Sequence, residues 1–223
     1  IIPEDLKKVF ISDKYQMLMF NSIYDIASDD LNKQVEIVDE IVKKYDRNAL
    51  VAGEGPLMKD LIEISNTDFN NVNVSSIVCI FFVLFIVLKS LSLPFLLIIA
   101  IEFAIFLNMG IAYFSGNILP FVAPIVLGTI QLGATIDYAI LMTDRYKENR
   151  QSLSKKKAVR QTISDVTVSI LTSGSVLTAV GLLLGYISTN QLLAQLGIFV
   201  GRGAIFSLVI VLLILPGLLF LFD

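Results

Sequence analysis

The sequence has 223 residues, 55% of them hydrophobic, and its mean hydropathy of +0.77 lies well above that of an ordinary soluble domain. Its formal net charge is −3, from 17 Lys and Arg against 20 Asp and Glu, and no nucleic-acid partner is expected. The absence of histidine and the presence of one cysteine, Cys79, exclude a disulfide framework, a Ser–His triad and the usual zinc sites within this chain. We expect no cofactor, no metal and no enzymatic activity.

The apolar residues are distributed unevenly along the chain. Residues 1–72 contain eight Lys and Arg and fourteen Asp and Glu, and they alternate polar and apolar side chains as a soluble domain does. From Val74 onward the chain is a series of long apolar runs, which predicts an integral membrane protein. The sequence begins at Ile1 without the features of a signal peptide and stops at Asp223 directly after an apolar run, so we expect a piece of a longer protein.

Residues 1–72 are expected to form a small α/β unit outside the cytosol. The elements predicted in chain order are a strand at Lys14–Ile23, a helix at Ser28–Asp46, a strand at Ala49–Ala52, a turn at Gly53–Pro56 and a helix from Leu57. The order β-α-β-α suits half of a ferredoxin-like sandwich.

Residues 73–223 are expected to form the transmembrane domain. Its five predicted spans are residues 73–90, 93–114, 119–145, 165–187 and 196–222. Each span is near the ~20 residues that cross the hydrocarbon core as a helix.

The links between the spans are short except for 146–164. This link contains Lys147, Arg150, Lys155, Lys156, Lys157 and Arg160. The positive-inside rule therefore places 146–164 in the cytoplasm and residues 1–72 on the other side of the membrane. Within the link, residues 152–163 suit either a solvated loop or a short basic helix lying on the inner membrane surface.

Three charged side chains fall inside the predicted spans: Glu102, Asp137 and Arg202. Intramembrane charges are rare and commonly face a bundle interior or a wet cavity. Counting from the inner ends of their spans, Glu102, Asp137 and Ser173 each lie eight residues deep, about 12 Å at ~1.5 Å per residue. The shared depth predicts a polar site near the middle of the bilayer.

Local spacing supports a site around Asp137. Thr129, Gly133, Asp137 and Asp144 fall on one side of a helix, and Gly133 allows close approach of a neighbouring helix or of water. The fourth span is rich in hydroxyls, including Thr172 and Ser173, which can solvate a carboxylate or pass on a proton.

Structural roles are the alternatives for these residues. For Asp137 the alternative is a purely structural hydrogen-bonding role. For Glu102 it is a protonated carboxyl group that only stabilises the bundle. Asp144 is expected to cap the inner end of its helix or to pair with Lys147 or Arg145. For Arg202 the two alternatives are snorkelling of its side chain to the outer interface and pairing. The glycines of the last two spans suit helix packing; they are Gly181, Gly185, Gly197 and Gly201. No Walker A motif is present, which favours an ion gradient over ATP as energy source.

The sequence resembles the resistance-nodulation-division (RND) superfamily, and within it the MmpL-type (MMPL family) transporters. The resemblance is carried by Gly133-Ala-Thr-Ile-Asp137-Tyr138, by Asp144-Arg145-Tyr146-Lys147-Glu148, by Gly197–Ser207 and by Leu215-Pro216. In that family each half consists of one helix, an external porter domain and five further helices. The resemblance implies that this chain is part of the porter domain and helices two to six of one half, for which the C-terminal half is favoured.

The resemblance also implies a function. Asp137 would carry a proton and Tyr138 would be its hydrogen-bonding partner, facing the matching pair of the missing other half. Gly133, Glu102, Thr172, Ser173 and Arg202 are expected to form the supporting polar site, although Glu102 is not part of the family motif. The expected function is proton-driven export of hydrophobic or amphipathic substrates across the bacterial cytoplasmic membrane, with protons, a lipid-like substrate and membrane lipids as partners.

Two other classes of function fit the same residues. A protein-translocation accessory of the SecD/SecF type shares the topology and an intramembrane aspartate, and would associate with a secretion channel. A lipid-sensing module without transport would keep ligand binding, with ion flux unchanged, after Asp137→Asn.

Overall fold

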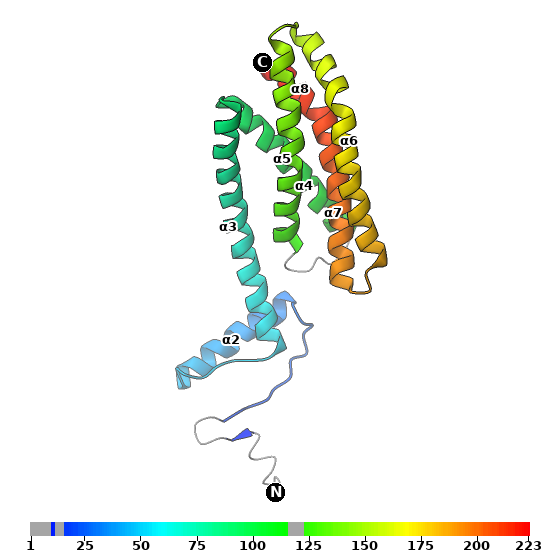
Figure 1. The fold of residues 1–223 in the computed structure, drawn as a ribbon. Helices are drawn as coiled ribbons and strands as arrows, with labels where there is room; N and C mark the ends of the chain where they lie inside the picture. Colours follow the sequence, from blue (N-terminus) through cyan, green and yellow to red (C-terminus); the bar gives the residue numbers. More distant parts are fainter. Residues whose placement is uncertain (1–9, 12–15, 116–122) are drawn as a thin grey trace. The chain divides into compact units, whose positions relative to one another are not determined.

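The computed structural model describes residues 10–11, 16–115 and 123–223. The chain divides into two compact units, Ile1–Glu63 and Ile64–Asp223. In Figure 1 most of the described residues lie in helices.

The first unit contains helix α2 (Asp29–Tyr45), as the sequence predicts. The side-chain oxygen of Ser28 accepts a hydrogen bond from the backbone N–H of Leu31, which satisfies one of the free donors at the start of the helix. Two acidic residues in the first turn and two lysines in the last turn complement the helix dipole. These local signals explain why the bounds of this helix are predictable.

The predicted strands are not found in the described residues. Residues 16–23 and 49–52 have no strand conformation, and the one bridge described is between Ile11 and Gln16; Lys14 and Tyr15 lie outside the described residues. A strand is stable only when its backbone groups pair with a neighbour along its length. In the described residues Gln16 bridges Ile11 and the backbone N–H of Met17 donates to the carbonyl of Phe10, and no strand pairing continues along residues 18–23 or 49–52. The ferredoxin-like arrangement is therefore not seen in the described part of residues 1–72.

Helix α3 (Glu54–Leu88) is longer than the sequence predicts. The predicted turn at Gly53–Pro56 is wrong, because the helix already begins at Glu54. Gly53 has φ +143°, a conformation that side chains rarely adopt, and Pro56 is tolerated in the first turn because its missing N–H has no helical partner there. No break separates the polar start of α3 from its apolar end, so this predicted helix and the first span are one element.

The other predicted spans correspond to the helices of the second unit. They are α4 (Ser92–Phe114), α5 (Ala123–Arg150), α6 (Lys155–Ile187) and a last segment made of α7 (Gln191–Val209), the π-turn η1 (Ile210–Ile214) and α8 (Leu215–Phe222). Residues 119–122 of the third predicted span lie outside the described residues. With α3 there are five segments in the described chain that are long and apolar enough to cross a membrane.

The π-turn η1 has a local cause. The backbone N–H of Leu215 donates to the carbonyl of Ile210, one residue further back than in an α-helix. Pro216 follows immediately, and a proline ring clashes with the carbonyl four residues before it in a regular α-helix. The wider turn before Pro216 accommodates that ring without ending the segment.

The predicted loop 146–164 is mostly helical. α5 continues to Arg150 and α6 begins at Lys155, so four residues, 151–154, make the α5–α6 turn. Residues 155–163 are the first turns of α6 and not a separate helix. The alanine, valine and isoleucine among the charged residues continue the apolar side of α6, where Ala158 is fully buried.

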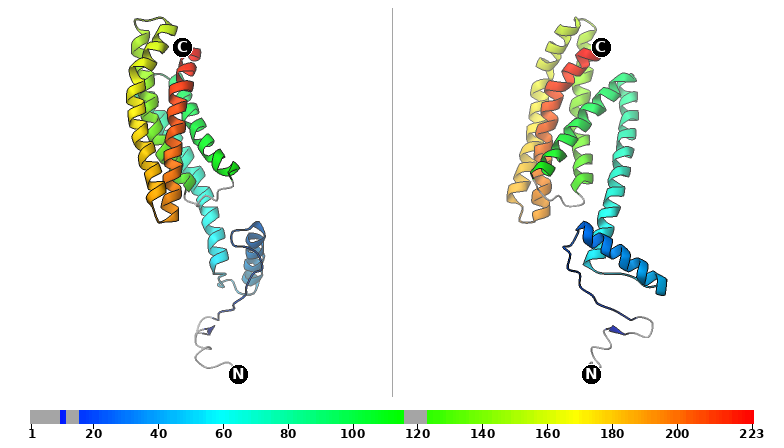
Figure 2. Two further views of the ribbon diagram at one scale, coloured as in Figure 1. Left: turned by 90° about the vertical axis from the view of Figure 1, so that its right-hand side faces the viewer. Right: turned by 180° about the vertical axis from the view of Figure 1, so that it is seen from behind.

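Helices α6 and α7 lie side by side in both views of Figure 2. A Cβ added at Gly181 would lie 2.5 Å from the backbone nitrogen of Gly201, and one at Gly197 would lie 2.6 Å from that of Gly185. The helix-packing role predicted for these four glycines is thus confirmed, since any side chain there would separate the two backbones.

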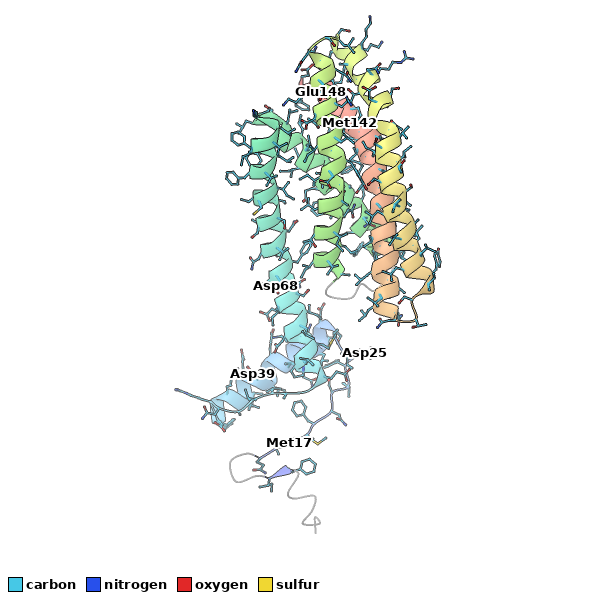
Figure 3. All side chains as sticks on the ribbon, in the orientation of Figure 1. Met17, Asp25, Asp39, Asp68, Met142 and Glu148 are labelled. Carbon is cyan, nitrogen blue, oxygen red and sulfur yellow. The ribbon has the colours of Figure 1, made fainter. Side chains whose placement is uncertain are left out.

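The core of the second unit lies between α4, α5, α6 and the last segment. Its fully buried side chains include Leu97, Ile101, Met142, Ile170 and Leu215. Figure 3 shows Met142 on α5 within this bundle and Glu148 further along the same helix, towards the α5–α6 turn.

Candidate functional site

Asp137 lies near the middle of α5, which runs from Ala123 to Arg150. Asp137 is exposed, and so are Gly133 and Thr129, one and two turns earlier on the same side of the helix. A Cβ added at Gly133 would meet no atom within 4 Å. We call Thr129, Gly133 and Asp137 the open face of α5. Within the described part of the chain, the carboxylate of Asp137 has no hydrogen bond and no ion pair.

Tyr138 points into the bundle, although it directly follows the exposed Asp137. Its side chain is 7% exposed, and its hydroxyl donates to the hydroxyl of Ser173 on α6 over 3.5 Å. The structure therefore brings Ser173 to the residue next to Asp137. Since 3.5 Å is long for an O–H···O bond, this hydrogen bond is weak.

The other hydroxyls of α6 mainly bond to their own helix. Thr172 donates to the carbonyl of Val168 over 2.8 Å, and Ser175 donates to the carbonyl of Thr172 over 2.9 Å. Both residues are exposed. Thr172 therefore stands beside Ser173 in the sequence without a side-chain contact to Asp137.

Glu102 is separate from Asp137 and Ser173. It is half-buried on α4, and its Oε1 atom is buried without a hydrogen-bond partner in the described structure. No contact joins Glu102 to Asp137 or Tyr138 among the described residues. The equal residue count from the ends of their predicted spans therefore did not bring Glu102 and Asp137 together, because position along a helix does not fix the side of the helix on which a residue lies.

Arg202 is bound to neutral groups on α4. Its Nε donates to Oδ1 of Asn108 and its Nη2 donates to the backbone carbonyl of the same residue, both over 2.8 Å. The guanidinium also lies over the ring of Phe199, at 4.5 Å from the ring centroid. Arg202 has no acidic partner in the described chain, so the pairing that the sequence offered as one of two alternatives is not found with a carboxylate.

Four buried polar residues of the bundle were missed by sequence reasoning. They are Asn108 on α4, Gln131 and Thr135 on α5, and Ser207 on α7. With Arg202 they form one connected set, which we call the amide network. A signal for it exists in the sequence: Asn108 and Gln131 are amides within apolar runs, and a buried amide is costly unless it is hydrogen-bonded.

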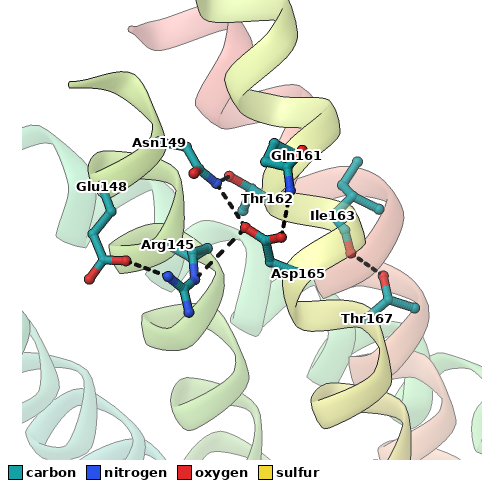
Figure 4. Close-up of polar contacts among 8 residues, drawn as sticks. All are labelled: Arg145, Glu148, Asn149, Gln161, Thr162, Ile163, Asp165 and Thr167. Carbon is teal, nitrogen blue, oxygen red and sulfur yellow. Dashed lines mark hydrogen bonds and ion pairs between the residues drawn. The ribbon is translucent and has the colours of Figure 1, made fainter. Parts of the chain in front are cut away.

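A second polar cluster lies at the end of the bundle near the α5–α6 turn (Figure 4). Arg145 contacts Glu148 at 2.8 Å and Asp165 at 4.0 Å, and the side-chain amide of Asn149 donates to Asp165 at 3.2 Å. Lys147 donates to the backbone carbonyl of Leu88. The pairing of Asp144 with Arg145 or Lys147 that the sequence suggested is therefore wrong.

Asp223 is held to the end of α5. Its side chain accepts from Nε of Arg150 at 2.5 Å and from the hydroxyl of Tyr146 at 2.9 Å. The hydrogen bond from Arg150 lowers the pKa of the Asp223 carboxyl below its ordinary value. These contacts fasten the end of α8 to α5.

Comparison with known proteins places these features in a family. The model of the MMPL family matches residues 4–222. The chain is 25% identical to the membrane protein MJ1562 of Methanocaldococcus jannaschii, over 98% of this chain and 58% of that protein. It is 29% identical to the membrane protein YdgH of Bacillus subtilis, over 74% of this chain and 19% of that protein. It is 26% identical to the probable transport protein MmpL1 of Mycobacterium tuberculosis, over 60% of this chain and 14% of that protein.

The chain thus spans just over half the length of the archaeal relative and a smaller share of the other two. The family match includes the five apolar helical segments, the open face of α5 and the amide network. The chain therefore belongs to the MMPL family.

Proposed function

We propose that this chain is part of a transporter that exports hydrophobic or amphipathic molecules, such as lipids or drugs, across the cytoplasmic membrane. Protons moving down their gradient supply the energy, and Asp137 is the group that binds and releases them. The observation that carries the proposal is a carboxylate in the middle of an apolar span, on the open face of α5. Membership of the MMPL family and the mycobacterial relative named a transport protein support it.

The chemistry follows from the position of Asp137. An ionised carboxylate in a low-dielectric region needs water, hydroxyls or a counter-charge, whereas the protonated form is far easier to bury. Protonation therefore changes which helix surface can be packed against the open face. Tyr138 and Ser173, next to this face, supply hydroxyls that can hold or pass on the proton.

The assembly is part of the proposal. The open face of α5 meets the equivalent face of the other half of the transporter, which brings two Asp-Tyr pairs together. Glycine at position 133 allows this approach, since the helix surface one turn before Asp137 carries no side chain.

The orientation is proposed from the charges. The basic residues around the α5–α6 turn support a cytoplasmic position for that turn. Residues 1–72 then belong to an external porter domain, and a ferredoxin-like sheet in that domain would need strands that the described residues do not form. Family membership favours transport over the translocation-accessory and lipid-sensing alternatives and over an enzymatic activity.

The test uses the full-length protein with Asp137→Asn, which keeps the size of the side chain and removes its proton site. We expect a carboxyl C=O band in pH-difference infrared spectra to disappear, and efflux of the hydrophobic dye Nile red from cells to stop, while the protein amount is unchanged. Asp144→Asn, seven residues further along the same helix, is the matched control and should keep both signals. A wild-type infrared spectrum or dye efflux in Asp137→Asn would refute the proton role.

A further inference from the structure

The amide network joins three helices through contacts that are almost all buried. Asn108 is 2% exposed, Gln131 6%, Thr135 0% and Ser207 1%. The side-chain amide of Asn108 donates to Oε1 of Gln131 at 2.9 Å and to the carbonyl of Phe199 at 3.2 Å. The amide of Gln131 donates to the carbonyl of Gly203 at 3.2 Å and to the hydroxyl of Ser207 at 3.4 Å. α4, α5 and α7 are thus connected by side chains at one level of the bundle.

Arg202 determines which atoms donate and which accept in this network. A guanidinium can only donate, so Oδ1 of Asn108 must face it and the Asn108 amide nitrogen must face Gln131. Oε1 of Gln131 then accepts, and its nitrogen faces Ser207. Every side-chain amide group of the two residues has a partner in this arrangement, so flipping either amide would leave buried donors facing donors.

The network ends at Thr135 on α5. Thr135 donates its hydroxyl hydrogen to the carbonyl of Gln131 at 2.6 Å, so in the 2.5 Å contact between the two hydroxyls Ser207 is the donor. Gln131 and Thr135 are one turn apart on the same side of α5, and both face α7. Two adjacent turns of α5 are therefore fixed to the neighbouring helix.

The absence of a side chain at Gly203 makes this arrangement possible. A Cβ there would lie 2.6 Å from Oε1 of Gln131 and 2.7 Å from Nδ2 of Asn108. No real Cβ approaches other atoms this closely, so a side chain at 203 would push both amides away from α7. The backbone of α7 can reach the amides because residue 203 is a glycine.

The fixed side of α5 determines where Asp137 points. Asp137 follows Thr135 by two residues, a rotation of about 200° around the helix axis. Thr135 is fully buried against Ser207, so Asp137 must lie on the opposite side, where it is exposed. Rotation of α5 about its axis by one residue would turn Asp137 towards the neighbouring helices. The same rotation would break the contacts of Gln131 and Thr135 with α7.

We propose that Gln131 and Thr135, held by Asn108, Ser207 and Arg202, are positioning residues that fix the rotation of α5 and so keep Asp137 on the open face. This inference rests on the proposed proton role of Asp137. The network acts only through Asp137, because none of its members contacts that side chain in the described structure.

The test measures the protonation of Asp137 in the full-length protein with the network intact or broken. The readout is the pH midpoint of the infrared carboxyl band that Asp137→Asn removes. Thr135→Val keeps the shape of the side chain and loses its hydroxyl, and Gln131→Leu removes the central amide. We expect each to move the midpoint by at least about half a pH unit, a threefold change in the protonation equilibrium.

Controls separate positioning from general damage to the fold. Thr178→Val removes a hydroxyl that bonds only the carbonyl of Gly174 in its own helix, and it should leave the midpoint unchanged. Thr135→Ser keeps the hydroxyl and should restore the wild-type midpoint. Gln131→Leu removes one of the two acceptors of the Asn108 amide nitrogen and leaves the carbonyl of Phe199 as the other. If this variant fails to fold, the isosteric Thr135→Val decides the test.

The outcomes distinguish this inference from the proposed function. If the Asp137 band titrates with the same midpoint in wild type, Thr135→Val and Gln131→Leu, the positioning role is wrong and the proton role stands. If no band depends on Asp137 in the wild-type protein, the proton role is wrong and the inference fails with it.

Discussion

The hydroxyl of Tyr138 on α5 lies 3.5 Å from the hydroxyl of Ser173 on α6, beside the exposed Asp137. A hydrogen bond this long contributes less than about 1 kcal/mol to stability. We therefore expect Tyr138→Phe to change the melting temperature in detergent by no more than about 2–4 °C. If the hydroxyl helps to hold the proton, Nile red efflux will fall although the fold is intact.

Ser173→Ala examines the same contact from the other helix, and Ser175→Ala is its matched control. The hydroxyl of Ser175 bonds only the backbone of its own helix. We expect Ser173→Ala to lower efflux as Tyr138→Phe does, and Ser175→Ala to leave it unchanged. Equal loss in the two serine variants would show that the Tyr138–Ser173 contact has no special role.

Gly181→Ala should destabilise the bundle at the contact of α6 and α7. Replacing a glycine inside a helix by alanine ordinarily stabilises it by up to about 1 kcal/mol. At Gly181 the new methyl group would lie 2.5 Å from the backbone of Gly201, so the helices must separate and the sign reverses. The control is Gly217→Ala, where a Cβ meets nothing within 4 Å. Thermal unfolding in detergent should show a lower melting temperature for the first variant, and an equal or higher one for the second.

Glu102→Gln is expected to keep transport. The carboxyl has a buried oxygen without a hydrogen bond and no contact with Asp137 in the described structure, so it has no route for passing a proton to the site. Nile red efflux should remain within about twofold of wild type, a difference of less than 0.5 kcal/mol in activation free energy. Loss of efflux in Glu102→Gln, with normal protein amount, would instead include Glu102 in the proton path.

The Arg150–Asp223 pair makes a pH-dependent contribution to stability. Because Arg150 lowers the pKa of Asp223, the ionised form is favoured in the folded state. The stabilisation is therefore fully present above the pKa of an unfolded aspartate, about 3.9, and is lost as the pH falls through the lower folded value. We expect Asp223→Asn to lower the melting temperature at pH 7, and this difference from wild type to disappear in acid.

Glu148→Gln provides the comparison for that experiment. Glu148 forms an exposed pair with Arg145 one turn away on the same helix, and such pairs contribute little to stability. Its melting temperature should match wild type at every pH. An equal effect of both substitutions would mean that the loss reflects surface charge in general and not the attachment of α8 to α5.

Sequence patterns predicted some elements well because their causes are local. α2 has an N-cap serine, acidic residues at its start and lysines at its end, and five apolar runs long enough to span a membrane gave five long helical segments. The glycine contacts of α6 and α7 were also predictable, since glycines at four-residue spacing in apolar helices have few other uses. The strands predicted within residues 1–72 are not found in the described residues. Their prediction failed because a strand depends on a partner that its own sequence does not specify.

Some features of the candidate site were also predictable from the sequence, and others were not. The sequence by itself determined that Asp137 lies in the middle of a span with Gly133 one turn before it, since depth and helical side follow from counting residues. Only the tertiary structure decided that Arg202 binds Asn108 and not a carboxylate, that Glu102 stands apart, and that Gln131 and Thr135 fasten α5 to α7. The physical reason is that contacts between helices depend on their rotation and close approach, which many side chains set together and no local pattern encodes.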